Sequence, residues 1–489
     1  MRAAFFFSSS IFCCAGQFVV ALTALVNLTS CQTSRAVTFA YNDATYGGEH
    51  YKSSDRTSVL FLMDGLSTEM LRTSLQTSNV PNISDAFTLS TKARFAVGRA
   101  AFPSLTFPNI ASILTGHPVS EHSVTGNRVM IDDKIVNFES VTNWEQLALT
   151  LQRRTIFYKL AEDSQSSVSY SYAFSGGATA YQTTSAAAAA GYLESDYVSI
   201  DTQTLTSLKT LLLSTQLSKW PRFIFVHIVG IDATAHSNGP FDKSVQAYIH
   251  AIDAQLREVF QILDHPNGQA ASTREINYAM TADHGFRATP DHSPLEDVVA
   301  HMKRKIQIIS DNRTAPLFLK EDMSADEKMK LAQALLLVPH VGWAVVKTED
   351  GVELLKRSGA RGRISIAKKK CPSGESAARF EWFPNADSKT AAPSLSTSQH
   401  FNCLSEFDLV TGADDDSYIV PALVDYFQAP HAPDMIFIPD DHSDFAEGYA
   451  GNHGGLSRDE MLVPVLTKGF DVQRGIRPTF DILRTMGVK

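Results

Sequence analysis

From Thr57 onward, short apolar runs alternate with amphipathic segments, and most runs end in an acidic or glycine-containing turn. Runs of this length are typical of buried strands, whereas the segments between them carry apolar residues at helical spacing. The pattern predicts an α/β fold with a central, mainly parallel sheet sandwiched by helices. The expected buried strands are 59–63, 223–229, 276–280 and 434–438.

Helix signals occur between these strands. Thr142 with Glu145, and Ser324 with Glu327, have the spacing of capping boxes, in which each side chain bonds the backbone N–H of the other residue. A third signal is a stripe of apolar residues at helical spacing, which is expected to pack on the core. The predicted helices are 143–153, 325–338 and one along the stripe 245–263.

The N-terminal 31 residues are typical of an export leader. Arg2 precedes an uncharged, largely apolar stretch at 4–26, and a polar segment of small residues follows. The segment 28–31 also fits a bacterial lipoprotein processing site, at which Cys31 would carry lipid and tether the protein to a membrane. An ordinary signal peptide and a retained membrane anchor remain open. We therefore expect an exported protein, either a periplasmic, membrane-anchored lipoprotein or a secreted one.

Differences in amino-acid composition divide the remainder of the chain into segments. Residues 32–55 are polar and without period, and are expected to be a linker to a catalytic domain at 56–489. Within that domain, 300–430 is rich in Ser, Thr, Ala and Lys and is expected to be an inserted cap subdomain. It holds Cys371 and Cys403, which in an exported chain form a disulfide or remain free thiols.

Charge narrows the class of partner. The 489 residues carry a formal net charge of -9, which argues against a nucleic-acid duplex. A small anionic substrate is still allowed, because bound metal ions can reverse the local field. Asn82 and Asn312 begin N-x-S/T sequons, which would be glycosylation acceptors in a eukaryotic protein.

Acidic and histidine residues gather where the predicted strands end, which is where α/β proteins place their ligands. Taken singly, each fits a helix cap or an ordinary surface side chain. Together, three carboxylates and three imidazoles are the oxygen and nitrogen donors that zinc accepts, in a number sufficient for two ions. These residues are Asp64, Asp232, His236, Asp283, His284 and His453.

Thr106 is the candidate nucleophile. It precedes a short apolar helix closed by Gly116, with Pro108 in the first turn, where its missing N–H costs nothing. Free backbone N–H groups and the helix dipole at such a position favour an alkoxide and an incoming phosphate. On this segment alone, a simple N-cap is the alternative role for Thr106.

These segments resemble the nucleotide pyrophosphatase/phosphodiesterase branch of the alkaline phosphatase superfamily. Residues 102–109 read F-P-S-L-T-F-P-N where the family reads F-P-T-x-T-F-P-N, and T-G at 115–116, His122 and G-N at 126–127 follow. The family's metal motifs are matched in the same chain order, so that the resemblance runs from about 57 to 468. The matching segments are D-G at 64–65, D-x-x-x-H at 232–236, T-A-D-H-G at 281–285 and N-H-G at 452–454.

The resemblance implies an alkaline-phosphatase-like fold and a zinc-dependent hydrolase of phosphate esters. Thr106 would attack phosphorus and form a phosphothreonine that water hydrolyses, and Asn127 would donate hydrogen bonds to a phosphoryl oxygen. Two Zn²⁺ ions, or other divalent metals, would be bound. One would be held by Asp64, Thr106, Asp283 and His284, and the other by Asp232, His236 and His453.

Two departures from the family pattern leave points open. Ser123 stands where glycine is common, and Ser104, where threonine is common, is a second candidate nucleophile. The substrate is expected to be a small phosphorylated molecule, possibly a nucleotide. Four aromatic residues either contact the leaving group or pack in the core: Tyr170, Tyr172, Phe174 and Tyr181. Alternatives on the same dinuclear site are a phosphomonoesterase, a phosphonate hydrolase and a phospho-alcohol transferase.

Overall fold

The computed structural model describes residues 54–87, 93–171, 173–181, 196–266, 274–302, 305–383, 400–407, 416–446, 448–471 and 477–488. The expected leader at 1–31, with Cys31, and nearly all of the linker at 32–55 lie outside these residues. Within the described ranges, no helix combines the length and the apolar character needed to cross a membrane.

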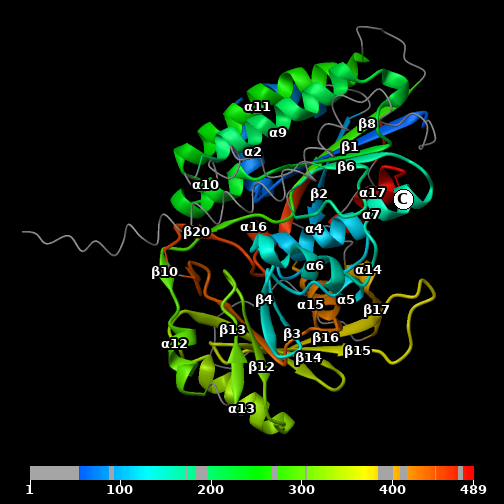
Figure 1. Ribbon diagram of the computed structural model, residues 1–489. Helices are drawn as coiled ribbons and strands as arrows, with labels where there is room; N and C mark the ends of the chain where they lie inside the picture. The colour runs from blue at the N-terminus through cyan, green and yellow to red at the C-terminus, as the bar shows by residue number, and fades with distance from the viewer. Residues whose placement is uncertain are drawn as a thin grey trace, which may run out of the picture.

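The central sheet has eight strands (Figure 1). Five neighbouring strands are parallel, β21 pairs antiparallel with both β8 and β2, and β22 is parallel to β2. The predicted mainly parallel sheet is therefore confirmed. In spatial order the strands are β22 (Arg477–Pro478), β2 (Ala93–Arg99), β21 (Leu462–Lys468), β8 (Glu275–Thr281), β1 (Arg56–Met63), β7 (Phe223–Ile228), β5 (Ser167–Tyr170) and β6 (Ala180–Tyr181).

Helices cover both faces of this sheet. The side chains of β1 show this, because they point alternately into two apolar clusters. Val59, Phe61 and Met63 point into one apolar cluster, and Leu60 and Leu62 point into another, because successive strand residues face opposite sides. The first cluster is completed by α2 (Thr68–Gln76), α3 (Pro81–Phe87), α9 (Tyr197–Ser214), α10 (Gly230–Asn238) and α11 (Lys243–Asp264). The second is completed by α4 (Thr106–Thr115), α6 (Trp144–Thr150), α7 (Ile156–Glu162) and α17 (Ile482–Thr485).

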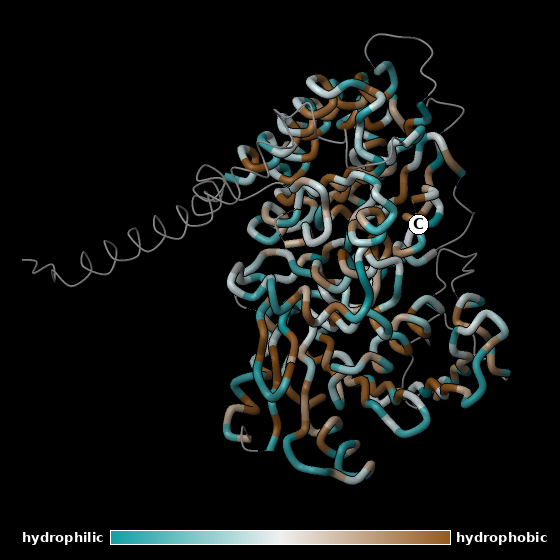
Figure 2. The backbone as a smooth tube through the Cα atoms, turned by 45° about the vertical axis from the view of Figure 1, so that its right-hand side comes forward, coloured by the Kyte–Doolittle hydropathy of each residue, from teal (hydrophilic) through white to brown (hydrophobic). Residues whose placement is uncertain are grey.

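A second, wholly antiparallel sheet forms the lower half of the molecule in Figure 1. The hydrophobic stretches of the chain lie mainly inside both halves (Figure 2). Cys371 and Cys403 form a disulfide beside this sheet. Its strands are β11 (Ile306–Ile308), β12 (Ala315–Leu319), β18 (Met435–Pro439), β13 (Val341–Thr348), β14 (Gly351–Lys356), β15 (Arg361–Ile366), β16 (Ala377–Phe383) and β17 (Asn402–Cys403).

The structure tests several predictions about single strands and helices. The strand expected at 434–438 forms β18, which belongs to the second sheet and not to the central one. The Ser324–Glu327 capping box is present and starts α13 (Ala325–Leu335). The Thr142–Glu145 box was wrong, because Thr142 lies in a 3₁₀ turn, its hydroxyl bonds Ser140, and α6 starts only at Trp144 without a side-chain cap.

Candidate metal centre and active site

Adjacent parallel strands bring the first ligands together. Asp64 follows β1 directly, and Asp283 and His284 follow the neighbouring strand β8. The carboxyl ends of parallel strands meet at one edge of a sheet, so these side chains converge although they are more than 200 residues apart. The backbone N–H of Gly65 donates to Asp283 Oδ1 over 3.2 Å, which ties the two strand ends to each other.

The other ligands come from a helix and a loop at the same edge. α10 begins right after β7, and Asp232 and His236 lie one turn apart on it, on the same side. His453 follows β20 (Gly451–Asn452), which pairs with β9 (Arg287–Ala288) beyond β8. The backbone N–H of Ala450 donates to the carbonyl of His236, which holds this loop against α10.

The six side chains form two clusters. The first cluster is Asp64, Asp283 and His284, and the second cluster is Asp232, His236 and His453; within each, one donor atom per residue lies within 4.8 Å of the others. In the first, His284 Nε2 is 3.4 Å from both Asp64 Oδ1 and Asp283 Oδ2. In the second, Asp232 Oδ1 is 3.6 Å from His236 Nε2 and 3.5 Å from His453 Nε2. The clusters adjoin, because the rings of His284 and His453 stack at 3.6 Å.

The imidazoles all present the same nitrogen to the clusters. Each Nδ1 lies within hydrogen-bond distance of a backbone carbonyl: His236 with Gly451 at 3.0 Å, His284 with Gly285 at 3.1 Å and His453 with Ser104 at 2.9 Å. A carbonyl only accepts, so Nδ1 carries the proton and Nε2 keeps a free lone pair. That is the arrangement found in metal-bound histidines, whose other nitrogen donates to a fixed acceptor.

Charge in the clusters is uncompensated within the described residues. Burial and repulsion from Asp283 raise the pKa values of Asp64 and Asp232 well above the ordinary range. Burial lowers the pKa of His236 to about 4 and holds that of His453 well below its usual value. The imidazoles are therefore neutral, as metal ligands must be, and the carboxylates lack a cation.

Three buried carboxylate oxygens have no hydrogen-bond partner: Asp64 Oδ1, Asp232 Oδ1 and Asp283 Oδ2. These are the oxygens that point into the clusters. Tetrahedral ligands at about 2.0–2.2 Å from zinc lie about 3.3–3.6 Å from one another, which matches the spacings above. The orphan oxygens, the unprotonated Nε2 atoms and the spacings thus fit a metal ion in each cluster.

Thr106 is the first residue of α4, and its Oγ1 lies 3.2 Å from His284 Nε2, beside the first cluster. The N-cap is Leu105, so Thr106 does not cap the helix through its side chain. The Ser104 hydroxyl is fully buried, donates to the carbonyl of Gly455 and accepts from the N–H of Gly454. It is thus committed to holding the His453 loop, and the geometry favours Thr106.

Asn127 lies next to this helix N-terminus. Its Oδ1 accepts from the backbone N–H of Phe107 at 3.1 Å, and its Nδ2 is 3.3 Å from Glu139 Oε1. The amide is therefore oriented with its oxygen toward the first turn of α4 and its N–H groups on the side of Glu139. Ser123, the departure from the family pattern, has a φ of 71°, a left-handed conformation that explains why glycine is common there.

Sequence reasoning missed the residues that support the ligands. His227, the single histidine of the apolar strand β7, places Nε2 2.8 Å from Asp64 Oδ2 and so leaves Oδ1 for the cluster. A single polar residue in an otherwise apolar strand next to β1 is the sequence signal that could have identified His227. Asp201 and Asp311, which carry no local motif, are buried carboxylates that accept backbone N–H groups near α10 and Asn127 respectively.

Two of the four aromatic residues proposed for the leaving group pack in the core, whereas Tyr181 is half-buried in β6 and Tyr172 lies outside the described residues. Tyr170 is buried in the core on the α9 side, and its hydroxyl donates to the carbonyl of Ser207. Phe174 is buried against Phe107, with ring centroids 5.7 Å apart. Core packing, the alternative left open, is therefore what the structure shows for both.

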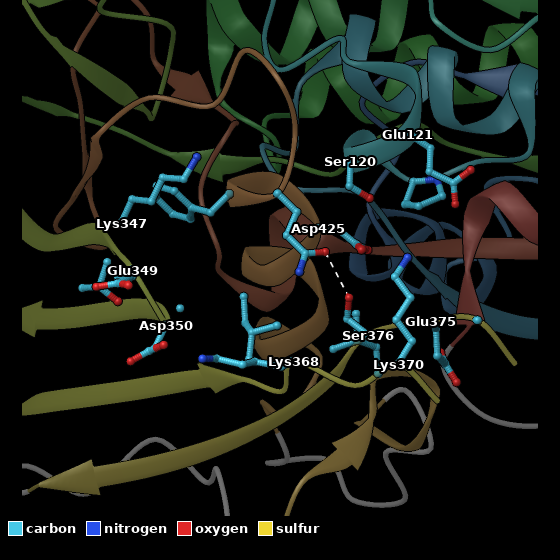
Figure 3. Close-up of a pocket in the computed structure, with 18 residues that line it drawn as sticks. Ser120, Glu121, Lys347, Glu349, Asp350, Lys368, Lys370, Glu375, Ser376 and Asp425 are labelled. Carbon is cyan, nitrogen blue, oxygen red and sulfur yellow. Dashed lines mark hydrogen bonds between the residues drawn. The ribbon is translucent and has the colours of Figure 1, made fainter. Parts of the chain in front are cut away.

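A separate hollow of about 690 Å³ lies against the second sheet. Figure 3 shows basic and acidic side chains interleaved around it, among them Lys347, Lys368, Lys370, Glu349, Asp350 and Glu375. None of its lining residues belongs to the ligand clusters. Charges of both signs give it no preference for one kind of ion, so it is not counted as part of the site.

Comparisons with known proteins identify the family and the fold. The sequence profile of the type I phosphodiesterase/nucleotide pyrophosphatase family matches residues 58–334, more than half of the chain. No curated protein sequence is significantly similar to it. Two crystal structures of phosphonoacetate hydrolase from Sinorhizobium meliloti 1021, with phosphonoacetate and with phosphonoformate, have the same fold. Each has 14% sequence identity and a TM-score of 0.55, and each alignment covers 92% of this chain and 98% of the hydrolase.

Proposed function

The chain belongs to the type I phosphodiesterase/nucleotide pyrophosphatase family, and we propose that it hydrolyses phosphate esters with two zinc ions and a phosphothreonine intermediate. The observation that carries the proposal is the position of Thr106. Its hydroxyl is 3.2 Å from His284, at the N-terminus of a helix and beside two metal-binding clusters. A hydroxyl at such a place is suited to attack phosphorus, because adjacent metal ions lower its pKa.

The two clusters would hold one ion each, zinc or another divalent metal. The first ion would be held by Asp64, Thr106, Asp283 and His284, and the second by Asp232, His236 and His453. When bound, the ions supply positive charge that stabilises both the attacking and the leaving oxygen of an in-line displacement. The chemistry of the orphan carboxylate oxygens and neutral imidazoles supports this assignment.

The chain's own residues then define the steps. Thr106 loses its proton and Oγ1 bonds to phosphorus, while the bond to the leaving oxygen breaks on the opposite side and that oxygen takes a proton. Asn127 donates from Nδ2 to a phosphoryl oxygen, and the backbone N–H of Thr106, at the first position of α4, adds a second donor. Water then attacks the phosphothreonine, and the Thr106 oxygen regains a proton.

Phosphonate hydrolysis is the second candidate. It is favoured by the similarity in fold to phosphonoacetate hydrolase over nearly the whole of both chains. The same nucleophile would attack phosphorus, and a carbon atom would leave in place of oxygen. A phosphomonoesterase and a phospho-alcohol transferase use the same clusters and stay as alternatives.

Substrate and location are proposed from the sequence. We propose a small phosphorylated substrate, with a nucleotide as one case, and not a nucleic-acid duplex, given the net charge of -9. The apolar leader supports export, as a secreted protein or a lipoprotein tethered through Cys31.

The test is a rate assay of the zinc-loaded protein with bis-p-nitrophenyl phosphate, p-nitrophenyl phosphate and phosphonoacetate. We expect turnover of the diester to exceed that of the others and to disappear with EDTA. Thr106→Ala should lower kcat by at least about 10³-fold with zinc content unchanged, and Thr106→Ser should retain part of the activity. An active Thr106→Ala variant would refute the nucleophile, and preference for phosphonoacetate would establish the second candidate.

A further inference from the structure

One turn of the second sheet reaches into the candidate site. It connects β11 to β12 and is closed by the Asp311 N–H, which donates to the Thr314 carbonyl over 2.8 Å. Asp311 Oδ2 accepts from the backbone N–H groups of Asn127 at 3.0 Å and Arg128 at 3.1 Å. The turn is therefore bonded directly to the loop that carries the phosphoryl-binding candidate Asn127.

The same turn is bonded to the His453 loop. The N–H of Arg313 donates to the His453 carbonyl over 2.9 Å. The Arg313 guanidinium is buried, pairs with Glu460 at 3.2 Å and donates to the Asp440 carbonyl at 2.9 Å. The carbonyl of Asn312 accepts from the N–H of Phe445 at 3.0 Å. Contacts on several sides thus fix the backbone of Asn312 before any substrate arrives.

The Asn312 side chain faces the second cluster. Its Nδ2 lies within hydrogen-bond distance of His453 Nε2, at 3.3 Å, and Nε2 is the unprotonated nitrogen, because Nδ1 donates to the carbonyl of Ser104. The residue is half-buried and has a φ of 57°, the left-handed conformation that asparagine tolerates better than most residues. The metal ligands that the resemblance to the family implies do not include this asparagine.

The position of Thr106 indicates which substrate atom would lie next to the Asn312 amide. Thr106 stands at the first cluster, and an in-line displacement puts the leaving atom on the opposite side of phosphorus. The second cluster adjoins the first, with Asn312 beside it, and we take the leaving atom to face this cluster. We propose that Asn312 is a catalytic residue whose Nδ2 donates a hydrogen bond to the leaving oxygen of the substrate. This inference rests on the proposed function and adds to it a residue that recognises the leaving group.

A ligand role for the Asn312 amide oxygen is the competing interpretation. It would give the second cluster four protein ligands, and catalytic zinc sites keep a position open for substrate or water. A donor role leaves that position open and gives the leaving oxygen a second stabilising contact. The two roles predict different zinc contents, so they can be separated.

The experiment uses the full zinc-loaded protein and two aryl methyl phosphates, one releasing p-nitrophenol and one releasing phenol. Asn312→Gly removes the amide and tolerates the positive φ, and Asn312→Asp keeps the shape without the donor. We expect kcat/KM to fall about 10²-fold for the phenyl ester and less than about 10-fold for the p-nitrophenyl ester, because the poorer leaving group depends more on the donor. Asp133→Gly, at an exposed turn with a φ of 60°, is the matched control and should change neither rate.

Two further readouts decide the inference apart from rate. Zinc content and zinc affinity of Asn312→Gly should equal those of the unmodified protein, and calorimetric affinity for orthovanadate should fall about 10-fold with the lost hydrogen bond. The inference would be overturned if Asn312→Gly lost a zinc ion or if kcat/KM fell equally for both esters. It would also be overturned if neither kcat/KM nor the vanadate affinity changed. If the unmodified protein cleaves no ester, the proposed function fails, and the vanadate affinity still decides the place of Asn312.

Discussion

At the scale of single residues, the site depends on buried groups that are oriented by the backbone. Ser104 accepts from one N–H of the His453 loop and donates to a carbonyl of the same loop. His227 takes one oxygen of Asp64 and leaves the other for the cluster. Asp311 accepts two backbone N–H groups of the Asn127 loop. His227 thus selects the oxygen of Asp64 that faces the cluster, whereas Ser104 and Asp311 fix the loops that carry His453 and Asn127.

The burial of Asp311 makes stability depend on pH. Burial, followed by repulsion from Glu139, raises the pKa of Asp311 to about 7. The folded state then binds a proton that the unfolded state has released, so stability falls as pH rises from about 4 to about 7. We expect Asp311→Asn to lack this loss: between pH 5 and pH 8, its Tm should fall less than that of the unmodified protein. Equal pH slopes in thermal unfolding of the two proteins would contradict the assignment.

At the scale of elements, α10 is held from outside. Its N-cap residue Val229 makes no side-chain cap, and Asp201 of α9 supplies the acceptors instead. Asp201 accepts from the N–H groups of Val229 at 3.0 Å and Gly230 at 2.9 Å, and from the Tyr248 hydroxyl at 2.8 Å. A Cβ at Gly230 would lie 1.8 Å from that hydroxyl, so only glycine fits at the start of the helix.

This capping predicts a link between α9 and the second cluster. Asp201→Ala leaves the buried N–H of Gly230 and the partly buried N–H of Val229 without their acceptor, which costs roughly 1–3 kcal/mol for the buried group. Because α10 carries Asp232 and His236, we expect zinc affinity at the second cluster to fall more than at the first. Titration of the metal-free protein with zinc measures both. Asp196→Ala, which removes the exposed cap of α9, is the control and should weaken stability without changing zinc affinity.

At the scale of the whole molecule, the centre joins segments that are far apart in the chain. Its candidate ligands run from Asp64 to His453 and come from two strand ends, a helix and a loop. The second sheet adds the turn at 311–314, which bonds both the Asn127 loop and the His453 loop. Ions at this place would therefore connect parts of the fold that otherwise repel through their carboxylates.

Removal of the ions should lower the stability of the entire protein. A ligand that binds only the folded state at about 1,000 times its Kd adds about 4 kcal/mol. We expect EDTA to lower the Tm by several degrees and zinc to restore it. His453→Ala should show a smaller EDTA effect, because one cluster is already impaired. An unchanged Tm on chelation of the unmodified protein would mean that no ion is bound at the centre.

The sequence by itself determined the α/β class, the family, the candidate nucleophile and the six candidate ligands. These are local properties: strand ends are marked by apolar runs, Asp232 and His236 are one helical turn apart, and each motif is complete within a few residues. A capping box was also read correctly at Ser324, where no other partner competes for the hydroxyl. At Thr142 a neighbouring hydroxyl does compete, and the box failed.

Only the tertiary structure decided the sheet to which β18 belongs, the imidazole nitrogen that faces each cluster, and the parts played by His227, Asp201 and Asp311. In the sequence, Asn312 was marked only as a sequon; in the structure its amide lies against His453. These features rest on contacts between residues far apart in the chain. The register of strands and the packing of loops set such contacts, and no short pattern of residues encodes them.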